Sequence, residues 1–244
     1  HLSPPMTTAG LYDEFEELEA LLDEHSHFEQ EHRESVSDIE DVIREKAISC
    51  HLIEEDWGAT MAVGDMITEV HEKLSDLKHM QMRNGLHILG QGPEGIDLEE
   101  FITAIIRNPQ GEMASGLAVI AEELGYDWSY VEEHTGETDK DGTRYSVIID
   151  RIWDELRSFV SYVVNTPDYS VSERLEPLAK AIVQEYIPKL GATKNELVSI
   201  SRALQGQYVE PGPGGAPSSG QVDVLSTGRN FYSLDERALP TKVA

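Results

Sequence analysis

Basic residues are scarce in this chain of 244 residues. Only 19 lysines and arginines stand against 46 aspartates and glutamates, which gives a net charge of −27. A surface this acidic repels the phosphates of nucleic acids and the headgroups of anionic lipids, so we expect no nucleic-acid partner. Carboxylates attract metal cations, but most of these carboxylates are explained by solubility alone.

Cysteine occurs once, at Cys50, which excludes an internal disulfide and a zinc site of the CxxC type. We expect Cys50 to pack near a helix end, because no neighbouring group would activate it as a nucleophile. Little cysteine is typical of a reducing compartment and indicates a cytoplasmic protein. The longest apolar runs, 113–121 and 159–164, are too short for a membrane span. The chain starts at His1 with neither an initiator methionine nor a signal peptide, so we expect a piece of a longer protein.

Sequence signatures of nucleotide and hydrolase chemistry are also absent. There is no Walker loop, no GxGxxG, no HExxH and no Gly-x-Ser-x-Gly. A self-contained nucleotide-binding or hydrolase domain is therefore not indicated. Candidate functional groups have to be sought among single side chains in unusual surroundings.

What the sequence does have is helical periodicity. Apolar residues recur every three or four positions, which is the spacing of one helix face. The pattern predicts helices over 10–32, 37–47, 59–83, 97–106, 112–124 and 145–164, and a polar loop over 132–142. Two further helices are predicted after the capping-box patterns Ser170-x-x-Glu173 and Thr193-x-x-Glu196, and they end near Pro188 and Leu204.

The expected fold class is mainly α: a multi-helix bundle with a short extended segment near 86–89 and a non-helical C-terminal tail. Residues 211–220 contain four glycines and three prolines, which neither a helix nor a central strand tolerates. We expect a helical domain over 1–205, which could divide into 1–84 and 95–205. An extended tail over 206–244 would pack on this domain or on other parts of a longer protein.

His87 stands out by its context. It lies in a short segment between Asn84-Gly85 and the glycines of 90–95, where the backbone can be held rigid. A neutral imidazole in such a place could bind a metal or move a proton. The alternative is a core histidine that bonds to the backbone.

Arg229 and Asn230 form a second candidate, within Thr227-Gly228-Arg229-Asn230. A guanidinium group suits the bidentate capture of a carboxylate, and an amide both donates and accepts hydrogen bonds. A ligand that bears several carboxylates or amides would fit. The alternative is an arginine that fixes the tail to the acidic helical body.

His25, Glu29 and His32 make a weaker candidate. Their spacing places them on one helix face, which could hold a cation. Acidic residues surround that face, so we expect it to be solvated surface instead.

Two stretches of the tail, Tyr208–Pro217 and Thr227–Asp235, resemble the large subunit of cobaltochelatases. The related magnesium chelatase large subunit has a similar tail but usually reads Ile-His-Ala where this chain has Phe231-Tyr232-Ser233. The opening His1–Met6 and the segment Gly85–Gly90 resemble the same family. Two departures are Ser226 and Glu236, at positions where the family usually or often has proline.

The resemblance implies a ligase that forms nitrogen–metal bonds: insertion of Co²⁺ into a corrin-type tetrapyrrole, hydrogenobyrinic acid a,c-diamide, during cobalamin synthesis. It implies two partner subunits, an AAA+ ATPase that uses ATP and a second small subunit, so ATP is not bound by this chain. His87 would be the catalytic and metal-binding residue, and Arg229 with Asn230 would bind the substrate. The chain alone would be inactive.

Two alternatives stay open at this stage. One is the magnesium chelatase large subunit, which inserts Mg²⁺ into protoporphyrin. The other is a non-catalytic helical scaffold on which the partner subunits dock.

Overall fold

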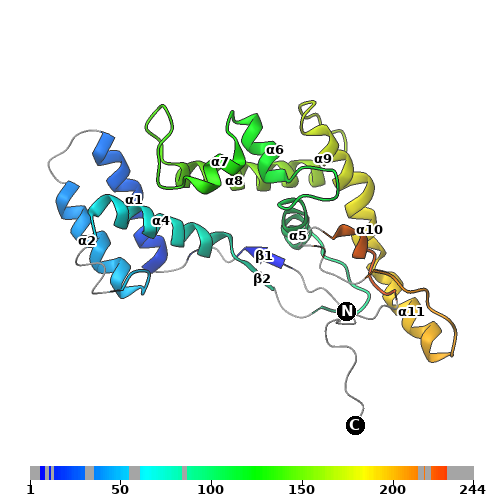
Figure 1. Ribbon diagram of the computed structural model, residues 1–244. Helices are drawn as coiled ribbons and strands as arrows, with labels where there is room; N and C mark the ends of the chain where they lie inside the picture. Colours follow the sequence, from blue (N-terminus) through cyan, green and yellow to red (C-terminus); the bar gives the residue numbers. More distant parts are fainter. Residues whose placement is uncertain are drawn as a thin grey trace, which may run out of the picture. The chain divides into compact units, whose positions relative to one another are not determined.

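The computed structural model describes residues 6–8, 11, 14–30, 36–54, 61–83, 87–213, 217 and 221–229. Helices dominate this part of the chain, and two short strands, β1 (Met6–Thr8) and β2 (Gln81–Arg83), pair with each other (Figure 1). The mainly α prediction is confirmed. None of the described helices is long and apolar enough to cross a membrane.

Two compact units share the chain. The first unit holds residues 8–82 and 125–154, and the second unit holds 1–7, 83–124 and 155–244. Both units are therefore built from separate stretches of sequence. The predicted domain boundaries at 84, 95 and 205 stay predictions.

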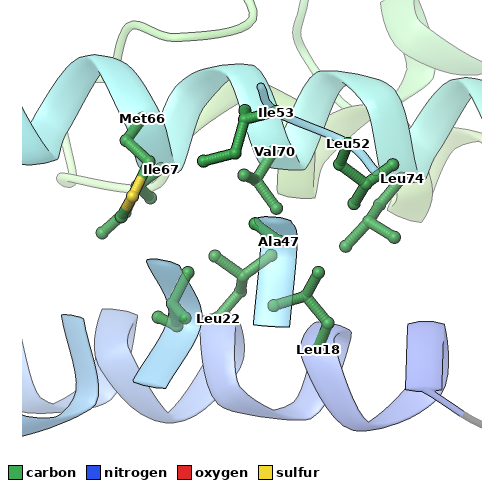
Figure 2. Packing of buried hydrophobic residues seen from close by; sticks show 10 residues of the cluster. Leu18, Leu22, Ala47, Leu52, Ile53, Met66, Ile67, Val70 and Leu74 are labelled. Atoms are coloured by element: carbon green, nitrogen blue, oxygen red, sulfur yellow. The ribbon is translucent and has the colours of Figure 1, made fainter. Parts of the chain in front are cut away.

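The core of the first unit lies among three helices, α1 (Glu14–Gln30), α2 (Val36–Ser49) and α4 (Val63–His79). Apolar side chains from all three helices, and from the turn after α2, point toward one another (Figure 2). They follow the helical period that the sequence shows, so burying one face of each helix excludes water from a shared interior. The buried members are Leu18, Leu22, Ile43, Ala47, Leu52, Ile53, Met66, Ile67, Val70 and Leu74.

Two histidines of the first unit are shielded from water, His25 fully and His71 in part. His25 on α1 is only 1% exposed, and its Nε2 lies 3.3 Å from Oε1 of Glu40 on α2. The prediction that His25 lies on a solvated face was wrong, because α2 supplies a partner on that side of α1. His71 on α4 is half-buried, and this desolvation, aided by the positive charge of Arg144, lowers its pKa to about 4 against the opposing effect of Asp150.

We expect the chain to lose stability as the pH falls from about 6.5 to about 4. The unfolded His71 takes up a proton near its ordinary pKa of about 6.5, whereas the folded chain resists it until about 4. Protonation across this window therefore favours unfolding, by an amount on the order of 3 kcal/mol. Urea denaturation of wild type and of His71→Leu at several pH values measures it. Stability of the variant should fall less steeply, and parallel curves would contradict the assignment.

The second unit is built around α5 (Ile96–Ile106), whose C-terminal half is packed on all sides. The six consecutive residues 101–106 are all buried, as in a helix surrounded by protein. Around it lie α6 (Gly116–Glu123) and the C-terminal part of α8 (Tyr145–Asn165). A helical run then follows from α9 (Glu176–Ala181) through α10 (Ile187–Gly191) to α11 (Asn195–Leu204), with few breaks (Figure 1).

Several helix boundaries differ from the prediction. The helix predicted over 59–83 ends at His79, because residues 81–83 pair with β1, a distant segment that periodicity cannot reveal. The helix predicted over 112–124 starts only at Gly116, where the Ser115 hydroxyl accepts a hydrogen bond from the Ala118 amide. The predicted loop 132–142 begins inside a short helix, α7 (Trp128–Glu133).

Pro188 does not end its helix as predicted. The run continues to Gly191 because a π-helical turn, Ile182–Tyr186, directly precedes the proline. In a π-helical turn an amide donates to the carbonyl five residues back instead of four. The backbone amide that proline lacks therefore costs less at this place.

The described part of the tail contains no α-helix, and its 3₁₀ residues are Pro217 and the turn Val222–Val224. Val224 and Leu225 are buried, and the Val222 amide donates to Oε1 of Gln110 at 3.3 Å. This part of the tail thus packs against the second unit and borders the site described next.

Candidate functional site

A histidine and a glutamate that are far apart in sequence meet inside the second unit. Nε2 of His87 lies 2.8 Å from Oε2 of Glu196, and the two side chains are 8% and 1% exposed. The backbone amide of Gly90 donates to the same Oε2 at 2.9 Å. The Glu196 carboxylate therefore ties the first turn of α11 to the segment 87–90.

Two glycines allow the loops to approach α11 this closely. Gly90 has a φ of +77°, and a Cβ there would lie 2.7 Å from Cδ1 of Leu197. Gly228 has a φ of +89°, and a Cβ there would lie 2.6 Å from Cα of Glu196. At Gly228 the neighbour is backbone, so only a residue without a side chain fits, whereas at Gly90 the positive φ is what favours glycine. The segments 87–90 and 227–229 thus hold the first turn of α11 between them.

Two cavities adjoin this turn. The first has a volume of about 700 Å³, and its lining includes His87, Asp97, Phe101, Lys194 and Thr227. The second has a volume of about 670 Å³, and its lining includes Leu89, Glu196, Ile200, Val209 and Arg229. Each is within the size range of small-molecule sites. The histidine borders the first cavity and its carboxylate partner borders the second.

Two enclosed oxygen atoms beside these cavities have no hydrogen-bond partner among the described residues: Oε1 of Glu196 and Oγ1 of Thr227. Buried polar atoms are rarely left unpaired, because the loss of hydration is costly. The site thus keeps unused capacity to accept a hydrogen bond or a cation.

Arg229 binds its own loop. Its Nη2 donates to the carbonyls of Asp223 and Leu225 at 2.8 and 3.3 Å, and its Nε donates to the carbonyl of Ser226 at 3.3 Å. These bonds shape the loop that carries Thr227 and Gly228, while the side chain also lines the second cavity. Asn230 lies outside the described residues.

Sequence reasoning missed Glu196, which it assigned to a capping box with Thr193. That assignment was wrong: the Thr193 hydroxyl donates to the Leu190 carbonyl at 2.6 Å, and no side chain caps α11. Glu196 turns inward to His87 instead. The signal available in the sequence was the position of Glu196 around the helix. Its spacing puts it on the same helix face as Ile200 and Ala203, and all three line the second cavity.

Neither Cys50 nor the acidic clusters offer a rival site. Cys50 follows directly after α2, and burial raises the pKa of its thiol, which disfavours the reactive thiolate. In the part of the chain that the structure describes, no three His, Cys, Asp or Glu side chains gather closely enough to hold a metal ion. His32 of the weaker histidine candidate lies outside the described residues.

Comparison with known proteins places the chain in a family. Residues 1–244 match the family described as CobN/Magnesium Chelatase. The chain belongs to this family. The catalytic subunit of cobaltochelatase from Mycobacterium tuberculosis has a similar structure, with a TM-score of 0.75 and 30% identity over 99% of this chain and 21% of that one.

Relatives of both metal types match along the whole chain. The aerobic cobaltochelatase subunit CobN of a Sinorhizobium species is 30% identical over 286 residues, and a magnesium-chelatase subunit of Chlorobaculum parvum is 27% identical over 266 residues. Both matches cover 100% of this chain but only 22% and 21% of the relatives. The chain therefore spans about a fifth of the length of the CobN/magnesium chelatase proteins that it matches.

Proposed function

We propose that this chain is part of the large subunit of an ATP-dependent cobaltochelatase. The subunit inserts Co²⁺ into a corrin-type tetrapyrrole, hydrogenobyrinic acid a,c-diamide, in cobalamin synthesis. The observation that carries the proposal is the enclosed His87–Glu196 pair between two cavities, in a chain of the CobN/magnesium chelatase family. The choice of cobalt rests on the cobalt-type residues Phe231-Tyr232-Ser233.

The reaction needs a base and a metal ligand. The inner N–H bond of the corrin breaks, its electron pair stays on the ring nitrogen, one proton leaves, and the four ring nitrogens bind the metal. An imidazole at the cavity wall can receive a proton or hold the cobalt ion while it sheds water, because imidazole nitrogen suits first-row metals. We assign both tasks to His87, which lines the first cavity. Its one free lone pair performs them in turn: it holds the cobalt ion first and receives the proton after the ion has passed to the ring.

Arg229 and Asn230 are assigned to the tetrapyrrole. Corrin precursors carry carboxylates and amides at the ring edge, which a guanidinium and a carboxamide can bind together. Arg229 lines the second cavity with the apolar side chains of Leu89, Ile200 and Val209, so this cavity would hold an arm of the ring edge while the ring nitrogens face His87 in the first cavity. ATP hydrolysis is left to two partner subunits, an AAA+ ATPase and a second small subunit.

Metal and macrocycle choice is tested by an insertion assay with a family-length subunit that contains this chain, both partner subunits and ATP. Absorption spectra follow Co²⁺ with the corrin in one reaction and Mg²⁺ with protoporphyrin in the other. Cobalt insertion alone is the expected result. Magnesium insertion into protoporphyrin would overturn the cobalt assignment and favour the magnesium chelatase alternative.

The scaffold alternative has one observation in its favour. Apolar side chains on α11 and just after it are exposed: Leu197 by 55%, Leu204 by 84% and Tyr208 by 79%. Such a stripe could contact a partner subunit. Calorimetric titration of the chain with each partner subunit, and separately with the corrin, discriminates the two functions. Binding of a partner without any binding of corrin would favour the scaffold.

A further inference from the structure

We propose that Glu196 is a positioning residue that fixes the tautomer of His87, with hydrogen on Nε2 and the lone pair on Nδ1. The inference rests on the proposed role of His87 and names the residue that prepares it. Sequence patterns did not single out this glutamate for the site. Its burial and its contact with His87 do.

The hydrogen-bond pattern around Oε2 sets the direction of the bond. An ionised carboxylate oxygen can only accept hydrogen bonds, and Oε2 already accepts one from the Gly90 amide. Nε2 of His87, at 2.8 Å, must then bring a hydrogen of its own. In a neutral imidazole the other nitrogen, Nδ1, carries the lone pair.

The backbone holds Glu196 in place to impose this choice. Gly228 packs directly on the Glu196 backbone, and Gly90 contacts the side chain of the next residue, Leu197. The backbone that carries Glu196 is therefore confined by two loops, and the Gly90 amide and His87 hold its carboxylate. A histidine whose partner is fixed in this way presents one nitrogen consistently, which is what proton transfer and metal binding require.

The chemical step follows from this arrangement. A macrocycle N–H bond breaks, its electron pair stays on the ring nitrogen, and the proton bonds to Nδ1 of His87. The Nε2–H group of His87 keeps its hydrogen bond to Glu196. The imidazolium that forms is therefore paired at once with a buried carboxylate. The same lone pair on Nδ1 would bind Co²⁺ in the metal-holding role.

Nitrogen-15 NMR of the histidine-labelled chain reads the tautomer directly. Wild type should show His87 protonated at Nε2 only. Glu196→Gln keeps the shape of the side chain but can donate as well as accept, so we expect mixed tautomers. Glu196→Asp keeps the acceptor and should retain more of the Nε2–H form. Glu99→Gln, which alters an exposed contact with Asn165 in the same unit, is the control and should leave His87 unchanged.

The same variants in the family-length subunit connect tautomer to rate. Glu196→Gln should slow cobalt insertion about 10- to 100-fold, with the KM for the corrin little changed. A wild-type His87 protonated at Nδ1, or a Glu196→Gln chain with an unaltered tautomer, would overturn the inference. The proposed function fails separately, if His87→Ala inserts cobalt at the normal rate whatever the tautomer.

Discussion

Replacing His87 by alanine is expected to lower the rate of cobalt insertion by a family-length subunit about 100-fold or more, the usual contribution of a general base. The imidazole is the one titratable group that borders the first cavity and is also paired with a buried carboxylate among the described residues. The KM for the corrin should change little, because the ring edge is assigned to Arg229 and Asn230. Steady-state insertion kinetics measure both values.

Two further variants make this test robust. His87→Ala leaves the Glu196 carboxylate with the Gly90 amide but without its side-chain partner, which costs about 1–3 kcal/mol and could disturb the fold. His87→Gln keeps an N–H donor for Glu196 but has no basic nitrogen, so it should fold normally and remain slow. His134, whose Nδ1 lies 2.8 Å from a carbonyl of its own helix turn, supplies the control, and His134→Ala should insert cobalt normally. Normal rates for both His87 variants would refute the site.

Gly228→Ala should destabilise the second unit by about 3 kcal/mol or more. Its φ of +89° already costs an L-residue about 1–2 kcal/mol, and the new Cβ would lie 2.6 Å from Cα and 2.8 Å from N of Glu196. Backbone cannot move aside as a side chain can, so the contact forces the loop away from α11. Urea denaturation followed by circular dichroism measures the loss.

Gly206→Ala is the matched control for this prediction. Gly206 also has a positive φ, +72°, but a Cβ there meets nothing within 4 Å. The cost should therefore be backbone strain alone, about 1 kcal/mol. Equal losses for the two variants would show that the approach of Gly228 to α11 is unimportant. A larger loss at Gly228, together with a changed NMR signal of His87, would tie the glycine to the site.

Apolar periodicity in the sequence predicted the helices that depend on neighbouring residues. The helix predicted over 145–164 is present as Tyr145–Asn165, and the apolar positions of α1, α2 and α4 form the core that their period indicates. The strand over 81–83 escaped prediction because its partner lies more than seventy residues away in sequence. The continuation of the helix past Pro188 depends on a π turn, which has no sequence signature.

The candidate site was only partly readable from the sequence for the same reason. His87 could be singled out by the glycines around it, and the tail by its resemblance to chelatases. Glu196 could not be linked to His87, because the contact spans 109 positions and depends on two loops meeting α11. Its capping-box spacing even favoured a different role. The loop bonds of Arg229 were equally hidden, since they join a side chain to backbone carbonyls.

The place where this chain binds cobalt decides whether His87 belongs to a metal-inserting site. Paramagnetic Co²⁺ titrated into the nitrogen-15 labelled chain broadens the amide signals nearest the ion, and an excess of Mg²⁺ occupies the weak carboxylate sites of the acidic surface. We predict that broadening begins at residues 87–91, 193–197 and 227–229, and that His87→Gln abolishes it. Broadening confined to the acidic helices α1 and α2, with these segments unaffected, would contradict the proposed site.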